Sequence, residues 1–137
     1  MKKIFIIVGA IIFIGVIAII SNSFNSIKIK RNIELKKALR EELMGKITDN
    51  EMTVDENGRV LLTEGYNNIA VNNYVRIFIC NREEKVVAFL YRAGFPDNEQ
   101  YIFYSSSDEQ LIKKYVQEYK YETIEKIDDH WFLVAYN

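Results

Sequence analysis

Hydrophobic and polar positions divide the chain into two regions. The first is an apolar stretch, Ile4–Ile20, which holds no charged side chain and follows Lys2 and Lys3. A helix needs about 20 apolar residues to cross the hydrocarbon core of a bilayer, within a range of roughly 17–25. The stretch of seventeen residues therefore predicts a single transmembrane helix, with residues 1–20 forming an N-terminal membrane anchor.

A cleaved signal peptide is the alternative interpretation of this segment. The apolar core of a signal peptide usually runs about 7–15 residues, which is shorter than Ile4–Ile20. Ser21-Asn22-Ser23 supplies small residues near the end of the stretch, but no Ala-x-Ala motif follows it. The length therefore favours a retained signal-anchor.

Basic residues lie on both sides of the apolar stretch, so the membrane orientation is finely balanced. Lys3 adjoins the stretch, whereas the first downstream lysine is Lys28. The positive-inside rule weighs nearby charges most, which favours a cytoplasmic N-terminus and an extracytoplasmic C-terminal domain. The downstream cluster can also contact anionic lipid headgroups; it comprises Lys28, Lys30, Arg31, Lys36, Lys37 and Arg40.

Residues 21–46 form a basic juxtamembrane linker and helix in this interpretation. Ser21–Ser26 is polar and predicts a hinge, and Arg31–Met44 predicts a helix that Gly45 ends. The predicted helix has an apolar stripe at helical spacing. Its members are Ile33, Leu35, Ala38, Leu39 and Leu43.

Residues 47–137 predict an α+β domain, with a mainly antiparallel sheet and one or two helices on one face. Asn57-Gly58 predicts a two-residue hairpin of type I′. Ser106 and Glu109 form a capping box that starts a helix ending near Lys120. The predicted strands are Met52–Asp55, Arg59–Thr63, Tyr74–Cys80, Lys85–Tyr91, Gln100–Tyr104, Tyr121–Ile127 and His130–Tyr136.

Charge and composition narrow the classes of function that are expected for this chain. Residues 47–137 carry nine basic and sixteen acidic residues, a net charge of −7, which disfavours nucleic-acid binding because phosphate contacts need cations. Cys80 is the only cysteine and His130 the only histidine, so neither a disulfide, a zinc site nor a nucleophilic Cys–His pair is expected. No phosphate-binding or hydrolase motif occurs, and we expect neither a cofactor nor an enzyme.

Two acidic segments contain residues that can bind a cation. Thr53–Glu64 has the length of an EF-hand loop, with Asp55, Gly58 and Glu64 at ligand or turn positions. Position 1 is Thr53 rather than Asp, and the same residues explain a hairpin, which is the favoured interpretation. Asp128-Asp129-His130 is better explained as a turn, because successive strand residues point to opposite faces.

The aromatic residues suggest the remaining hypothesis. Most of them should pack in the core, but those in a loop or on a short strand could be exposed as interface residues. The candidate partner-binding residues are Phe95, Pro96, Tyr101 and Tyr104. The sequence thus favours a membrane-anchored, non-catalytic interaction or accessory domain. The alternatives are a small-molecule or cation sensor and, less favoured, a carboxylate-dependent envelope hydrolase.

Overall fold

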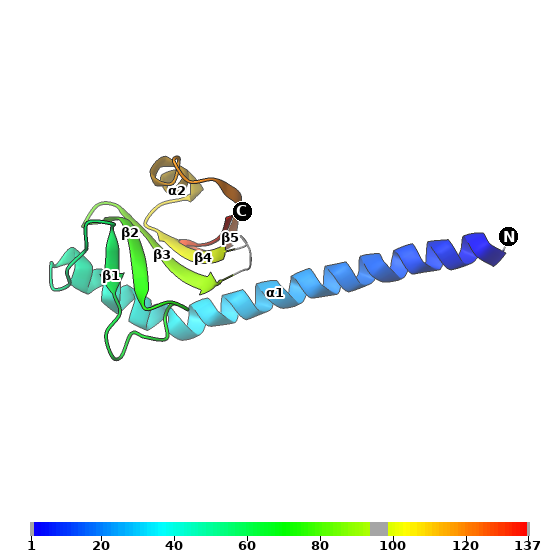
Figure 1. Cartoon of the computed structure of the whole chain (residues 1–137), viewed down its shortest axis with the longest axis horizontal. Helices are drawn as coiled ribbons and strands as arrows, with labels where there is room; N and C mark the ends of the chain where they lie inside the picture. Colours follow the sequence, from blue (N-terminus) through cyan, green and yellow to red (C-terminus); the bar gives the residue numbers. More distant parts are fainter. Residues whose placement is uncertain (1, 94–98, 137) are drawn as a thin grey trace. The chain divides into compact units, whose positions relative to one another are not determined.

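The structure, a computed structural model, describes residues 2–93 and 99–136, without the side chains of residues 2–10 and 21–24. These residues form two helices and one six-stranded sheet (Figure 1), which confirms the predicted α+β class. The elements are α1 (Lys2–Thr48), β1 (Arg59–Leu61), β2 (Tyr74–Cys80), β3 (Lys85–Arg92), β4 (Glu99–Ser105), α2 (Glu109–Tyr115), β5 (Tyr121–Asp128) and β6 (Trp131–Tyr136).

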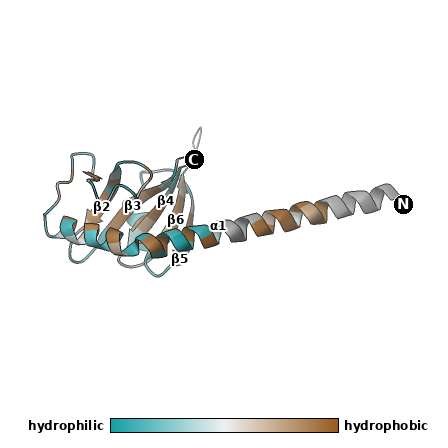
Figure 2. Cartoon of the chain, turned by 90° about the horizontal axis from the view of Figure 1, so that it is seen from below, coloured by the Kyte–Doolittle hydropathy of each residue, from teal (hydrophilic) through white to brown (hydrophobic). Residues whose placement is uncertain are grey.

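Two compact units divide the chain, Met1–Asn32 and Ile33–Asn137. In the first unit the side chains of residues 11–20 are exposed, and Figure 2 shows this part of α1 as apolar. The helix is long and apolar enough to cross a membrane, judged by length and composition. The hinge predicted at Ser21–Ser26 is wrong, because these residues are helical.

The sheet of the second unit has the strand order β1-β2-β3-β4-β6-β5, and every neighbouring pair is antiparallel. Paired residues on adjacent strands lie on the same face of a sheet. One such row crosses the sheet and includes Arg59, Arg76, Ala88, Phe103 and Phe132. The residues beside them, such as Val75, Val87 and Phe89, point to the opposite face.

The C-terminal part of α1, residues 33–48, covers this opposite face (Figures 1 and 2). Its buried residues recur every three or four positions, as an amphipathic helix requires; they are Ile33, Arg40, Leu43, Met44 and Ile47. The predicted stripe was partly wrong, since Leu35 is 73% exposed and Ala38 is also exposed. Gly45 does not end the helix, which continues to Thr48 before Asn50 adopts a positive φ of 58°.

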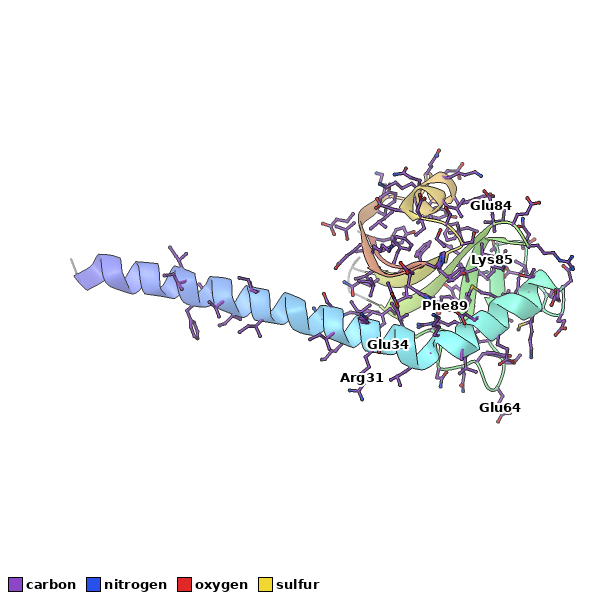
Figure 3. The ribbon with its side chains drawn as sticks, turned by 180° about the vertical axis from the view of Figure 1, so that it is seen from behind. Arg31, Glu34, Glu64, Glu84, Lys85 and Phe89 are labelled. Carbon is purple, nitrogen blue, oxygen red and sulfur yellow. The ribbon has the colours of Figure 1, made fainter. Side chains whose placement is uncertain are left out.

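Arg40 occupies the centre of this covered face and is only 1% exposed. Its guanidinium lies 5.0 Å from the ring centroid of Phe89, labelled in Figure 3, and 5.8 Å from that of Trp131. Its Nη2 donates a hydrogen bond of 2.9 Å to the carbonyl oxygen of Ile69. Burial lowers the pKa of Arg40 to about 10, so the side chain stays cationic at neutral pH.

The segment between β1 and β2 packs beside α1 although it forms no strand, as predicted for Glu64–Asn73. Ile69 is 1% exposed, and Tyr66 donates a hydrogen bond to the carboxylate of Glu42. Lys36 donates to the carbonyl oxygen of Asn68. The loop is therefore held by polar side chains from one face of α1, which sequence periodicity does not reveal.

The turn before β1 differs from the predicted hairpin. Met52–Asp55 is not a strand, and β1 pairs with β2 instead. Gly58 has φ of +70° and donates a 3.0 Å bond to the carbonyl of Asp55, while Asn57 does not have a positive φ. This is the geometry of a three-residue loop with glycine at the left-handed position rather than a type I′ turn.

The short helix α2 lies on the other face of the sheet from α1. Its N-cap is Asp108 rather than Ser106, because the Asp108 carboxylate accepts from the amides of Gln110 and Leu111. The hydroxyl of Ser106 instead accepts from the Lys85 amide. Ile112 and Val116 are buried against Val86, Phe103 and Phe132, and the helix ends at Tyr115, earlier than predicted.

Candidate functional site

The face of the sheet that carries α2 is only partly covered, and the uncovered part contains a cavity. Its volume is about 160 Å³, close to the ~150 Å³ of an engineered protein cavity that binds benzene. The lining is aromatic, with one cation and one anion. It comprises Arg76, Phe78, Ala88, Glu99, Tyr101, Phe103, Tyr119 and Tyr136.

Two local irregularities build the walls of this cavity. A register shift between Ile77 and Ile79 lets Phe78 and Ile79 both pack on the face that carries α2, as a β-bulge can do. The turn after α2, closed by a 2.9 Å bond from the Tyr119 amide to the Val116 carbonyl, brings Tyr119 over the sheet. The rings of Phe78 and Tyr119 meet edge to face at 5.6 Å.

Arg76 is the cation of the cavity. Its guanidinium lies 5.2 Å from the ring centroid of Tyr119. Arg76 is directly opposite Arg59 on β1, and like charges in this position repel each other. Arg59 is compensated, because its Nε lies 3.2 Å from a carboxylate oxygen of Asp55.

Two tyrosines of the cavity, Tyr101 and Tyr136, keep their protons at neutral pH. Burial raises the pKa of Tyr136 to about 12. Burial, together with the hydrogen bond to Glu99, raises the pKa of Tyr101 well above its usual value. The Tyr101 hydroxyl donates a 2.8 Å bond to Glu99, and the neutral hydroxyl of Tyr136 can donate to a ligand.

The lining of the cavity combines apolar surface with hydrogen-bonding and charged groups. General acid–base catalysis needs groups that change protonation state near the working pH, and Tyr101 and Tyr136 do not change theirs there. Within residues 2–93 and 99–136, no group of three or more His, Cys, Asp or Glu side chains is placed to hold a metal ion. The arrangement suits recognition of a small group that combines apolar surface with charge.

The sequence-predicted interface residues are separated in the structure. Tyr101 lines the cavity, whereas Tyr104 lies on the face covered by α1, with its ring 5.1 Å from that of Trp131. Phe95 and Pro96 lie outside the described residues. The role of these residues in partner binding stays a prediction.

Sequence reasoning did not select Arg76, Tyr119 or Tyr136 as site residues. One indication existed, because Arg76 is the only charged residue of the strand Tyr74–Cys80. The helix predicted to end near Lys120 would include Tyr119, but this residue is 40% exposed in the turn that follows α2. Its position over the sheet depends on where that helix ends, which the periodicity did not indicate.

The EF-hand-like residues are used differently in the structure. The Asp55 carboxylate accepts from the amides of Asn57 and Arg59 and from the guanidinium of Arg59. Glu64 is exposed at the end of a loop, as Figure 3 shows. Thr53–Glu64 therefore contains a turn and strand β1 rather than a loop between two helices.

Cys80 and His130 take structural positions. The thiol of Cys80 lies 3.5 Å from the hydroxyl of Thr48, and burial raises its pKa. His130 has a positive φ of 66° in the turn between β5 and β6, and its Nδ1 lies 2.9 Å from the carbonyl oxygen of Ser105. Cys80 therefore contacts the C-terminal end of α1, whereas His130 contacts the end of β4.

No protein-family model, no curated protein and no solved structure matches this chain. The function is therefore argued from the site alone.

Proposed function

We propose that this chain is a membrane-anchored, non-catalytic interaction protein. Residues 4–20 hold it in the membrane, and the uncovered part of the sheet binds a protein partner in the membrane or the envelope. The observation that carries the proposal is the composition of this surface. Three tyrosines, two phenylalanines and one arginine are among its eight lining residues, and aromatic residues and arginine are enriched in the centres of protein interfaces.

The surface extends from the cavity to the sheet edge, which supports a partner larger than the cavity alone would hold. Leu61 on β1 is 66% exposed and pairs with Tyr74 on β2. Tyr74 in turn packs under the guanidinium of Arg59, 5.2 Å from its ring centroid. An exposed leucine beside rigid aromatic rings gives a partner apolar area at little cost in side-chain entropy.

Photocrosslinking in native membranes tests this proposal. A benzoylphenylalanine at Leu61 should give one discrete protein adduct, because Leu61 adjoins the cavity without lining it. The matched control is Leu35, a leucine of similar exposure, 73%, on the outer side of α1. Equal adduct patterns at Leu61 and Leu35, or no adduct at Leu61, would contradict binding through the uncovered face.

The membrane attachment has its own test. The protein should remain in the membrane fraction through high-salt and carbonate washes, because an apolar helix rather than charge holds it. Recovery of soluble protein that starts near Phe24 would show a cleaved signal peptide instead.

The proposed orientation places the C-terminal domain outside the cytoplasm. Protease added to spheroplasts should then remove a tag placed after Asn137. Full protection of that tag until lysis would reverse the orientation.

The basic residues after the anchor are proposed to contact anionic lipid. Arg40 is excluded from this surface, because it is buried within the second unit. The proposal is therefore confined to the other basic residues, namely Lys28, Lys30, Arg31, Lys36 and Lys37.

A ligand sensor is the second candidate function, and the size of the cavity is the observation that favours it. A volume of about 160 Å³ suits one small molecule as well as one side chain of a partner. A sensor would bind its ligand with no protein adduct at Leu61.

A further inference from the structure

We propose that the cavity beside Arg76 is a binding subsite for a carboxylate, supplied by an acidic or C-terminal residue of the protein partner. This inference rests on the proposed function and names the chemistry that the partner brings to the cavity.

Arg76 has N–H donors that no described residue uses. Its guanidinium contacts the ring of Tyr119, and within the part of the chain that the structure describes it forms no salt bridge and no hydrogen bond. A guanidinium presents five N–H donors in a fixed planar fork, which matches the two oxygens of a carboxylate. Arg76 therefore has free donor capacity at the edge of an aromatic cavity.

Arg76 on β2 is paired with another arginine, Arg59 on β1. The two residues face each other on adjacent antiparallel strands, where like charges destabilise the sheet. Asp55 neutralises Arg59 through a 3.2 Å contact, but no described carboxylate does the same for Arg76. A ligand carboxylate would give Arg76 a counter-charge, as Asp55 does for Arg59.

The cavity beside the Arg76 guanidinium has apolar walls and one neutral hydroxyl donor. The walls include Phe78, Ala88 and Phe103, which suit an apolar stem, and Tyr136 offers a neutral hydroxyl donor. Glu99 lines the same cavity, and its carboxylate already accepts from Tyr101. A second carboxylate should therefore bind at the arginine end, with Glu99 lowering its affinity by repulsion.

Ligand-observed fluorine NMR on the full chain in zwitterionic nanodiscs tests the inference. The probe is 4-fluorobenzoate, a carboxylate on a ring that the cavity can hold, and 4-fluorobenzamide is its uncharged control. Empty nanodiscs correct for partition into lipid. The variants are Arg76→Gln, Arg76→Lys, Glu99→Gln and, as the matched control, Arg59→Gln, whose guanidinium lies at the same 5.2 Å from a tyrosine ring.

We expect 4-fluorobenzoate to bind and the amide to bind at least ten-fold more weakly. Arg76→Gln should weaken benzoate binding about ten-fold or more, since a hydrogen bond to a charged group contributes about 1.5 kcal/mol or more. Arg59→Gln should change it less than about two-fold, because Arg59 is already paired. Arg76→Lys should retain part of the affinity, and Glu99→Gln should increase it.

Three results would overturn the inference: no binding of benzoate, equal binding of the amide, or equal losses in Arg59→Gln and Arg76→Gln. Far-ultraviolet circular dichroism of each variant shows whether it is folded, and Glu99→Gln gives an independent gain of affinity if Arg76 variants fail.

Competition assigns the source of the carboxylate. Excess benzoate should reduce the adduct formed at Leu61, whereas an undiminished adduct would contradict a partner-borne carboxylate. An adduct at Leu61 without any benzoate binding would support the interaction surface but contradict the carboxylate subsite.

Discussion

Arg40 packs against aromatic rings on one face of the sheet and Arg76 does so on the other, and these two arginines differ in what surrounds them. Arg40 comes from α1, lies against Phe89 and Trp131, and is 1% exposed. Arg76 comes from β2, lies over Tyr119 and is only half-buried. The same residue type thus completes the core on one face and remains available to a ligand on the other.

The difference follows from what covers each face. Residues 33–48 of α1 and the loop before β2 enclose Arg40, and the Ile69 carbonyl accepts from its guanidinium. On the other face α2 contains only seven residues and covers the cluster around Phe103 and Phe132. A charged residue in a strand is therefore a candidate binding residue only if the face of the sheet on which it lies is uncovered.

Replacing Arg40 should have the largest effect on stability. Arg40→Ala removes a buried side chain and leaves the Ile69 carbonyl without this donor, so unfolding should become easier by about 3 kcal/mol. The comparison is Arg76→Ala, which should change stability by less than about 0.5 kcal/mol. Urea unfolding of the full chain in nanodiscs, followed by Trp131 fluorescence, measures both; similar losses would remove the distinction between the faces.

Replacing Gly58 should have the next largest effect on stability. This glycine positions β1, and hence Arg59, opposite Arg76. Its φ is +70°, and an added Cβ would lie 2.8 Å from the Ile77 carbonyl oxygen. Gly58→Val should therefore cost about 2 kcal/mol. Gly45→Ala is the control, because that helical glycine has open space and should gain up to about 1 kcal/mol. A neutral Gly58→Val would disprove this turn geometry.

Replacing Asp55 should have a smaller effect on stability, and this effect should depend on pH and salt. The amide and guanidinium of Arg59 lower the pKa of Asp55. A carboxylate with a lowered folded-state pKa contributes stability above its unfolded pKa of about 4, and this contribution disappears as pH falls through the folded-state value.

The difference in melting temperature between wild type and Asp55→Asn should therefore be present at neutral pH and vanish in acid. It should also shrink when Arg59→Gln is added, because the unpaired repulsion with Arg76 is then removed. A difference that is equal at all pH values would show that the Asp55 charge plays no part.

The smallest expected effect concerns Cys80, and it is a difference in labelling rate rather than in stability. Burial raises its pKa, and the thiol lies near the Met44 carbonyl on the face covered by α1. Iodoacetamide at neutral pH should modify it slowly, because the thiolate is the reactive form. Leu61→Cys in a Cys80→Ala background should react much faster, as mass spectrometry would show; equal rates would mean that α1 does not protect its face.

Some features were determined by the sequence alone, because local patterns fix them. The charge-free stretch Ile4–Ile20 predicts a helix long enough for a membrane, and Tyr74–Cys80 matches β2 at both ends. Continuous apolar runs and short polar turns depend on nearby residues only. The α+β class follows from the same local signals.

Other features were decided only by tertiary packing. The burial of Arg40 at a core position, the pairing of β1 with β2, and the placing of Tyr119 over Arg76 all depend on residues distant in sequence. A periodic pattern counts Arg40 as polar and Leu35 as apolar, yet packing reverses their exposure. The physical reason is that the free energy of a side chain depends on which neighbours remove its water and satisfy its polar atoms, and the chain assembles those neighbours only when it folds.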